Sequence, residues 1–316
     1  MQLIQRIKKR LFRPRVLSGL VTSGSRAPRS RDAFVEQGQS QVYRIVSEGD
    51  VQELFQKINA LWDNAWGNLF QPEHRILIKI NLNTSDPYPA STSPEMLAEL
   101  VDLLRARGLR RIKVGDCSWN GALPTRNVAR QAGITGAVAG KAKMVFFDEG
   151  SWVTVPLPGT FLKKVTVPEI ALNVDRIIFL ANLKTHFLAD FTFGLKLAVG
   201  FMHPLERSLL HQERLREKVV EINLAVPADL TIIDGRTAFV SGGPARGRAE
   251  KAGLVLAGTN PLAVDVEAYR QLYNLKKQHQ LEESFSADPF QMIQLSHARE
   301  CGLGGETWPG YTCVDL

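Results

Sequence analysis

The chain has 316 residues, of which 44% are hydrophobic and 22% charged, so it can form one large α/β domain or two modest ones. No apolar run approaches the roughly 20 residues of a membrane span, which predicts a soluble protein. Cys117, Cys301 and Cys313 form no CxxC pair and no metal-type spacing. This sparse set indicates a reducing compartment, and we expect neither a disulfide framework nor an intrinsic iron–sulfur cluster.

The formal net charge of +7 belongs to the N-terminus. Residues 1–31 contain nine basic residues and no acid, and the rest of the chain is close to neutral. A basic body would indicate a nucleic-acid partner. Because this body is neutral, we expect no nucleic-acid partner.

Residues 1–39 are predicted to be a basic tail, with three interpretations. Apolar residues at positions 3, 4, 7 and 11 recur at helical spacing beside basic ones, which favours peripheral membrane contact through residues 1–15. The acid-free, Arg- and Ser-rich composition also fits a transit-type segment. The plainest alternative is a solvated, poorly ordered extension. No apolar stretch of about 7–15 residues follows the charges, so we expect no secretory signal and a cytoplasmic protein.

The predicted elements alternate between strands and helices along the chain. Strands are predicted at 42–46, 75–80, 111–116, 143–150, 175–183, 228–235 and 252–258. Helices are predicted from Asp50 to about residue 62 and at 94–108, 124–132, 188–202, 204–223, 261–273 and 288–299, with Ser93 and Pro94 as N-cap and first helical residue of the second. Residues 152–158 and 161–168 predict an inserted β-hairpin, and the chain end is expected to be irregular.

This alternation predicts a single three-layer α/β domain over residues 40–305, with a mainly parallel, doubly wound sheet and a small β insertion. Residues 306–316 are expected to be a C-terminal extension. Ligands of such sheets bind at the carboxyl ends of the strands. Polar residues follow nearly every predicted strand there, among them Lys79, Asn81, Asp116, Asp148, Lys184, Thr185, His186 and Asp234. Any one aspartate could be a helix cap or turn residue, but together they predict a site.

Residues 188–203, taken as a helix, place Thr192, Lys196, Gly200 and His203 on one face. Lys184 and His186 precede its N-terminal end, where backbone N–H groups favour an anion. The structural alternatives are that Lys196 reaches through apolar neighbours to solvent and that His203 caps a helix C-terminus.

The expected roles divide into three sets. The catalytic set is Lys184, His186, Lys196, Asp116 and Asp234; the substrate-binding set is Lys79, Asn81, Thr185, Thr192, Gly200, Gly242 and Gly243; a divalent metal would be held by His203, His211 and Asp265. The glycines belong to the segment SGGPARGR (241–248), which could line a phosphate or carboxylate or form a plain turn. Cys117 is either a reactive thiol or a small buried residue, and the second interpretation is favoured.

Several motifs resemble the domain of unknown function 362 family. They are ILIKINLN, TSPEMLAELVDLLRARG, IKVGDCSW, NLKTHFLADFTFGLKLAVG, LTIIDGRTAFVSGGPARG and LVLAGTNPLAVDVEAYRQL, and the resemblance runs from about residue 75 to 305. Many members have Lys-Pro-Asn where this chain has Lys79-Ile80-Asn81, and Lys-Asn where it has Lys196-Leu197. Many also carry a ferredoxin-like four-cysteine segment that this chain lacks. The resemblance implies no established reaction.

Two functions remain open. The first is an enzyme that acts on a small anionic metabolite, with lysines as anion ligands and a histidine, aspartate or lysine of lowered pKa in proton transfer. The second is a non-catalytic protein that delivers a metal, cofactor or cluster to a redox partner. An acid and a base paired in one buried cleft would favour the enzyme.

Overall fold

The computed structural model describes residues 21–29, 40–46, 50–62, 66–67, 69–119, 124–305 and 307–316. The membrane-contact prediction for residues 1–15 lies outside these ranges. Within them, no helix is both long and apolar enough to cross a membrane.

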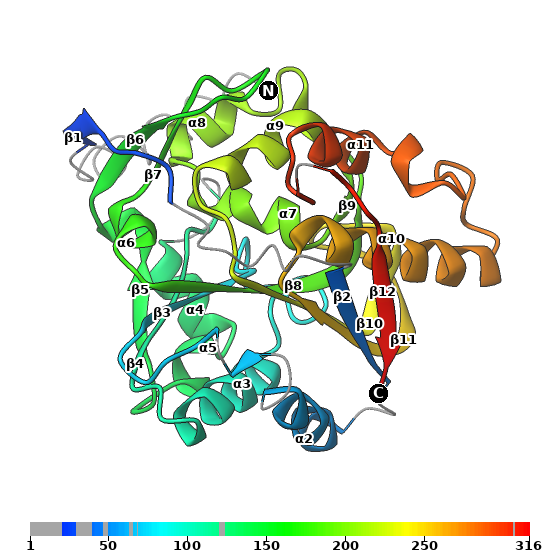
Figure 1. Ribbon diagram of the computed structural model, residues 1–316, viewed down its shortest axis with the longest axis horizontal. Coiled ribbons are helices and arrows are strands. Elements are labelled where there is room, and N and C mark those ends of the chain that lie inside the picture. The colour runs from blue at the N-terminus through cyan, green and yellow to red at the C-terminus, as the bar shows by residue number, and fades with distance from the viewer. Residues whose placement is uncertain are drawn as a thin grey trace.

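A mainly parallel central sheet organises the described residues (Figure 1). Its strands run, in spatial order, β12 (Tyr311–Asp315), β2 (Ser40–Val46), β11 (Gly247–Gly258), β10 (Leu230–Gly242), β8 (Arg176–His186), β3 (Arg75–Ile80), β4 (Arg111–Asp116) and β5 (Lys143–Phe146), and a ninth strand, β9 (Asp190–Thr192), pairs with β8. The strands from β10 to β5 are mutually parallel, whereas β11 is antiparallel to both β10 and β2. The α/β fold class predicted from the sequence is confirmed.

Helices cover both faces of this sheet, as Figure 1 shows. One face carries α2 (Val51–Leu61), α3 (Pro94–Ala106), α4 (Thr125–Gln131) and α5 (Ile134–Ala137). The other carries α6 (Glu169–Leu172), α7 (Gly194–Leu197), α8 (Pro204–Leu209), α9 (Leu215–Glu221), α10 (Pro261–Gln278) and α11 (Ile293–Glu300), with short 3₁₀ turns at Phe147–Glu149, Ala198–Phe201, Ile222–Leu224 and Pro289–Gln291.

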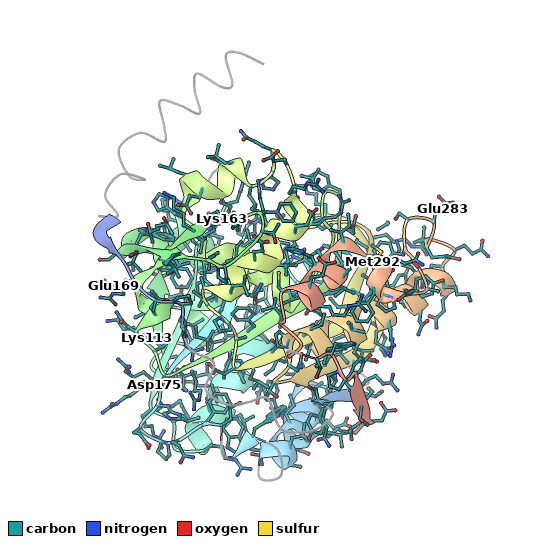
Figure 2. The ribbon with its side chains drawn as sticks, turned by 45° about the horizontal axis from the view of Figure 1, so that its top comes forward. Lys113, Lys163, Glu169, Asp175, Glu283 and Met292 are labelled. Carbon is teal, nitrogen blue, oxygen red and sulfur yellow. The ribbon has the colours of Figure 1, made fainter. Side chains whose placement is uncertain are left out.

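Side chains of the central strands alternate between the two cores. Ile76 and Ile78 of β3 pack with the α2–α5 layer, and Leu77 between them packs with the α6–α11 layer. A strand buried on both faces therefore needs a continuous apolar run, which is the pattern that made these strands predictable. Side chains fill the space between the layers on both sides (Figure 2).

The predicted hairpin is present as β6 (Trp152–Pro156) and β7 (Lys164–Pro168), which are antiparallel. A third strand, β1 (Val21–Ser25), pairs with β6. The tail interpretation as a solvated extension is wrong for this part of the chain. The side chain of Arg29 is also buried, with its Nη2 2.6 Å from the Asp229 carboxylate, so this segment is attached to the body.

The predicted helix at 188–202 is wrong. β8 continues to His186, the chain reverses through Asp190 at φ 64°, β9 pairs back on β8, and only α7 and a 3₁₀ turn follow. The buried Asp265 carboxylate of α10 accepts hydrogen bonds from the Gly194 and Leu195 N–H groups, which starts α7 there. The helix predicted at 204–223 is likewise split into α8 and α9, with Arg214 at φ 53° between them.

Two further predictions concern the Gly-rich segment, where the plain-turn interpretation is the correct one, and the chain end. The Gly-rich segment 241–248 is the turn of the long β10–β11 hairpin. The chain end is not irregular, because Tyr311–Asp315 forms β12, parallel to β2.

Candidate functional site

The carboxyl ends of β3, β4 and β8 open into a cavity of about 830 Å³. The segment from β9 to the turn after α8 supplies much of its wall. Of the predicted site residues, those that line the cavity are Lys79, Asn81, Asp116, Lys184, His186, Thr192, Lys196, Gly200 and His211. The structure therefore brings together most of the lysines and histidines that the sequence analysis selected, although it does so without the predicted helix.

Lys79 and Asp116 form a buried ion pair at the cavity floor, with Lys79 Nζ 2.7 Å from Asp116 Oδ1. The Asp116 carboxylate also accepts hydrogen bonds from the Leu82 and Cys117 N–H groups. Burial lowers the pKa of Lys79, and the adjacent carboxylate opposes that effect. Gly200 lies directly over the pair, because a Cβ there would overlap both Asp116 Oδ1 and Lys79 Nζ.

Lys184 is fully buried without a carboxylate partner among the described residues. Its Nζ donates to the carbonyl oxygens of Ala90 and, at 3.2 Å, of Pro244. Burial, followed by the nearby charge of Lys196, lowers the pKa of Lys184 to about 7. A buried amine whose pKa lies near neutrality can hold or release a proton under ordinary conditions.

Lys196 has no hydrogen bond or ion pair among the described residues, and its partly buried side chain faces the cavity. Burial and the charge of Arg207 lower its pKa to about 8. Near it, the buried Thr192 hydroxyl of the cavity wall has no hydrogen-bond partner in the described part of the chain. Buried polar groups are seldom left unpaired, so both groups are suited to a ligand.

Arg207 is a lining residue that was not among the site residues selected from the sequence. Its guanidinium donates to the carbonyl oxygens of Cys117 at 2.9 Å and Met202 at 3.1 Å, and its buried Nε has no partner in the described part. Met202 is close to Arg207 in the sequence, whereas Cys117 lies 90 residues away, so the sequence alone could not place the guanidinium beside the end of β4. Carbonyl oxygens carry no formal charge, so these hydrogen bonds do not neutralise the positive charge of the guanidinium.

His186 is held as a neutral ring. Its Nδ1 accepts hydrogen bonds from the N–H groups of Leu188, at 3.1 Å, and Ala189, at 3.3 Å, so the proton of the neutral ring sits on Nε2. Burial and the charges of Lys196 and Lys184 keep its pKa well below the ordinary value. His186 can therefore donate a hydrogen bond from Nε2, and it is poorly suited to the proton-accepting role first expected of it.

Several predicted residues lie outside the cavity lining. Asp234 forms an ion pair with Arg236 and accepts from the Tyr88 hydroxyl at 2.8 Å. Thr185 is buried beside Gly243, where a Cβ would overlap the Thr185 carbonyl oxygen. Gly242 sits at positive φ in the same hairpin turn.

The predicted metal ligands do not form one cluster. His203 is the N-cap of α8, where its Nδ1 accepts from the Leu205 N–H, and its ring packs edge-on against Trp152. Asp265 caps α7, and burial raises its pKa to about 7. His211 alone of the three lines the cavity.

Cys117 also lines the cavity and is buried. Burial raises the pKa of its thiol to about 11, so it is protonated at neutral pH and lacks the thiolate that a nucleophile requires.

The structure is that of an α/β protein with a cavity lined by cationic side chains at the carboxyl edge of its sheet. The chain belongs to the family described as "Domain of unknown function (DUF362)", whose profile matches residues 76–270, more than half of the chain.

Two known proteins are similar to the chain. "Thylakoid-associated protein sll1697" of Synechocystis sp. is 28% identical over 208 residues, which cover 63% of this chain and 63% of that protein. The match therefore spans less than two thirds of the relative. Among solved structures, that of the lactate racemase apoprotein from Thermoanaerobacterium thermosaccharolyticum is 13% identical, with a TM-score of 0.36 over 64% of this chain and 51% of the other.

Proposed function

We propose that the protein is an enzyme that binds a small anionic metabolite in the cavity and moves a proton on it, with Lys196 as the proton-transferring group. The observation that carries this proposal is the excess of buried cations around the cavity.

The lining residues include four cationic side chains, Lys79, Lys184, Lys196 and Arg207, against the single carboxylate of Asp116. The Asp116 carboxylate forms an ion pair with Lys79, with Oδ1 2.7 Å from Nζ. Holding the remaining cations away from water costs free energy, and a bound anion would offset that cost. A purely structural role would be better served by apolar side chains of similar volume.

The roles follow from the hydrogen bonding of each group. Arg207 and the Nε2–H of His186 supply donors for the anion, and Lys184, fixed by two carbonyl oxygens, supplies charge beside them. Lys196 has no hydrogen-bond or ion-pair partner in the described ranges and a pKa of about 8, so it is the group best able to take or give a proton. The two amines influence each other, so their protons come off as a coupled pair.

The cavity also has apolar lining. The side chains of Trp119, Phe187, Leu188, Leu197 and Val199 line it. A ligand that fills the cavity would therefore combine an anionic head with an apolar body.

The test is turnover in heavy water. Purified protein is incubated with a panel of small carboxylates and phosphates that carry apolar substituents, and deuterium incorporation or product is followed by mass spectrometry. We expect exchange with wild type and with Lys277→Met, which alters an exposed lysine of α10 away from the cavity, and none with Lys196→Met.

An anion that binds tightly without exchange or product would contradict the enzyme proposal. That result would favour the second function, a non-catalytic binding or delivery protein. The buried Lys79–Asp116 pair in the same cleft as two amines of lowered pKa supports the enzyme over the carrier.

A further inference from the structure

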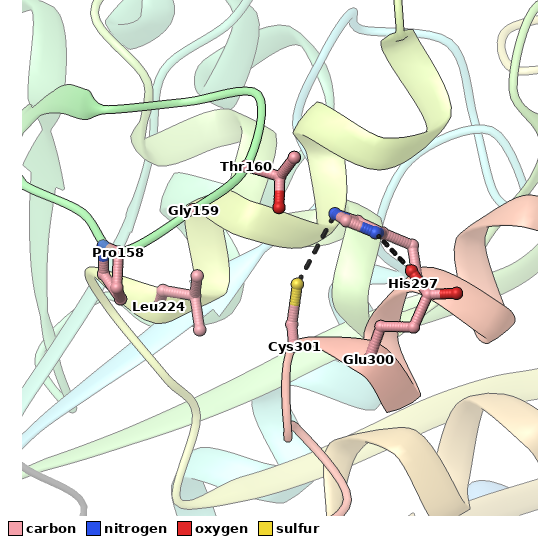
Figure 3. A pocket seen from close by; sticks show the side chains of 7 residues that line it. All are labelled: Pro158, Gly159, Thr160, Leu224, His297, Glu300 and Cys301. Atoms are coloured by element: carbon pink, nitrogen blue, oxygen red, sulfur yellow. Dashed lines mark hydrogen bonds and ion pairs between the residues drawn. The ribbon is translucent and has the colours of Figure 1, made fainter.

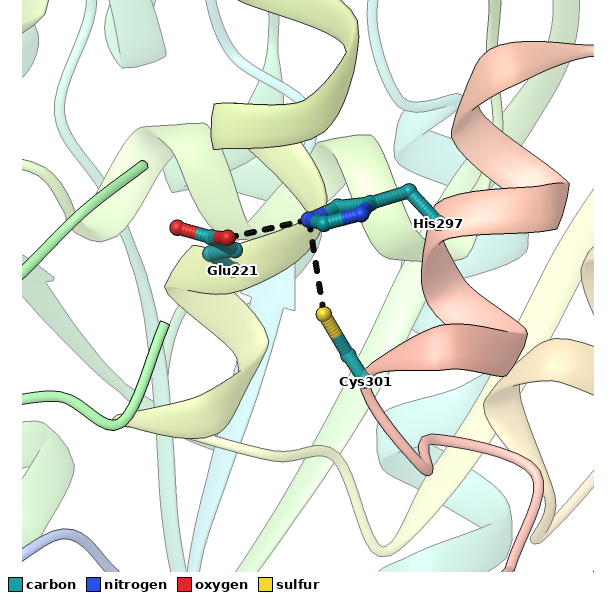
Figure 4. A group of neighbouring side chains, drawn as sticks. All are labelled: Glu221, His297 and Cys301. Atoms are coloured by element: carbon teal, nitrogen blue, oxygen red, sulfur yellow. Dashed lines mark hydrogen bonds and ion pairs between the residues drawn. The ribbon is translucent and has the colours of Figure 1, made fainter. Parts of the chain in front are cut away.

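A second cluster of chemically active side chains lies away from the cationic cavity, between α9 and α11 (Figure 4). It consists of Glu221, His297 and Cys301, whose ligating atoms all lie within 4.8 Å of one another. His297 Nε2 is 2.9 Å from Glu221 Oε1 and 3.5 Å from Cys301 Sγ. None of these residues takes part in the proposed function.

The backbone aims the three groups at one point. His297 and Cys301 are four residues apart at the end of α11, so their side chains share a face of one helical turn. The Glu221 carboxylate is held by the N–H groups of Thr160 and Leu162 in the loop between β6 and β7. The cluster thus joins three segments that are distant in sequence.

Two of the three ligand–ligand distances are close to those around a tetrahedral ion, and the third is within 4.8 Å. Ligand atoms about 2.0–2.3 Å from a tetrahedral zinc ion are about 3.3–3.8 Å apart. The Nε2–Sγ distance of 3.5 Å already lies in that range, and the Nε2–Oε1 distance of 2.9 Å would lengthen by a few tenths of an ångström.

Glu300 lies on the far side of the imidazole, with its Oε2 3.2 Å from His297 Nδ1. A carboxylate at that nitrogen accepts a hydrogen bond from Nδ1–H and favours the tautomer whose Nε2 lone pair is directed at Glu221 and Cys301. In a neutral ring that lone pair would face a carboxylate oxygen. A cation at the point where the three groups meet would interact favourably with both that lone pair and the carboxylate.

A cavity of about 230 Å³ adjoins the cluster, lined by His297, Glu300 and Cys301 together with Pro158, Gly159, Thr160 and Leu224 (Figure 3). It provides room for a water molecule or a small ligand as a fourth donor. A divalent ion held by one carboxylate and one thiolate would be electrically balanced, which suits a buried position.

We propose that Glu221, His297 and Cys301 bind one divalent ion of the zinc class, with Glu300 positioning the imidazole. The mixed oxygen, nitrogen and sulfur ligand set favours Zn²⁺ or Co²⁺ over Mg²⁺ or Ca²⁺. Binding releases the thiol proton of Cys301 to solvent, and the ion clamps α11 to α9.

The test uses the full chain, treated with chelator, kept reduced and then supplied with Zn²⁺ or Co²⁺. We expect about one Zn²⁺ per chain by elemental analysis after removal of excess metal, a cobalt–thiolate absorption band, and a rise in melting temperature on Zn²⁺ addition. Cys313→Ser, which alters a thiol of β12, serves as the matched control and should bind like wild type.

Cys301→Ser should lose the absorption band and the stoichiometric zinc. Glu300→Gln alters an exposed carboxylate, so it should fold normally and weaken Zn²⁺ affinity about 10- to 100-fold. The proposal is overturned if wild type takes up no stoichiometric metal, or if Cys301→Ser or Glu300→Gln binds it as wild type does. Either result would leave the cluster as a His297–Glu221 ion pair alone.

Discussion

Lys196 is the residue on which the account of the cavity depends. Two interpretations of a lysine in an apolar segment were open from the sequence, a functional cation and a side chain that reaches solvent. In the described residues it has no ion-pair partner and lines the cavity beside Arg207. Its charge is therefore uncompensated, which is typical of a binding site held at some cost in stability.

Lys196→Met should preserve the fold or stabilise it by up to about 1–2 kcal/mol, because it removes a partly buried charge and strands no acid among the described residues. Urea denaturation at neutral pH measures this, with Lys277→Met expected within about 0.5 kcal/mol of wild type. A loss of about 3–5 kcal/mol would mean that Lys196 is half of a structural ion pair.

The lysine pKa values also predict how stability responds to pH. In the folded protein the pKa of Lys184 is about 7 and that of Lys196 is about 8, both below the ordinary lysine value of 10.5. At a pH between the folded and the ordinary pKa, the unfolded chain therefore binds more protons than the folded one. The free energy of unfolding contributed by these groups should rise with pH from about 7 to about 10. The slope should be smaller in Lys196→Met than in wild type when denaturation is repeated across that window, and equal slopes would contradict the two pKa values.

Gly200→Ala tests the buried ion pair. The new Cβ would overlap Asp116 Oδ1 and Lys79 Nζ, so the pair must separate, and we expect a loss of about 2–4 kcal/mol in thermal or urea unfolding. Gly136→Ala in α5 is the matched control, since a Cβ there meets nothing within 4 Å, and it should be neutral or slightly stabilising. Equal effects of the two substitutions would show that Gly200 has no special contact with the pair.

Helices and strands with a clear local sequence pattern, such as an apolar run or an N-cap residue, were predictable. β3 is a continuous apolar run and α3 has Ser93, whose hydroxyl accepts from the Met96 N–H as an N-cap should. The segment 188–202 was not predictable, because its conformation depends on pairing with β8 and on Asp265, about 70 residues later. Its helical periodicity nevertheless selected side chains that do face the cavity, including Thr192 and Lys196.

Residues 21–29 also depend on contacts with residues far away in the sequence, which a local pattern cannot predict. Nothing local distinguishes Arg29 from the other basic residues of 1–31, yet it is buried against Asp229. Its partner lies 200 residues away, so only the folded chain reveals the pair.

Arg29→Met should therefore destabilise the protein by about 3–5 kcal/mol in urea denaturation, because it leaves the buried Asp229 carboxylate without its cation. Arg26→Met is the control from the same segment: its ion pair with Glu169 is solvent-exposed, and its loss should cost less than about 1 kcal/mol. If the two variants unfold alike, residues 21–29 do not anchor to the body as described.

At the scale of the whole molecule, the parallel strands explain why distant residues share one cavity. β3, β4 and β8 end at the same edge, so Lys79, Asp116 and Lys184 meet there although about 100 residues separate the first from the last. The sequence predicted this convergence from strand ends. It could not predict which of these polar side chains face the cavity. Asp234, for example, forms an ion pair with Arg236 and accepts a hydrogen bond from the Tyr88 hydroxyl.

The most direct test of the cationic cavity is a titration of anion binding against pH. Wild type, Lys196→Met and Lys277→Met are titrated calorimetrically with small carboxylates and phosphates at about pH 6.5 and about pH 9. We predict that at least one anion binds wild type and Lys277→Met with an affinity about tenfold or more higher at the lower pH, because Lys184 and Lys196 are protonated there. Lys196→Met should bind that anion about tenfold or more weakly than wild type does. Binding that is indifferent both to pH and to Lys196→Met, or no binding of any anion, would contradict the account.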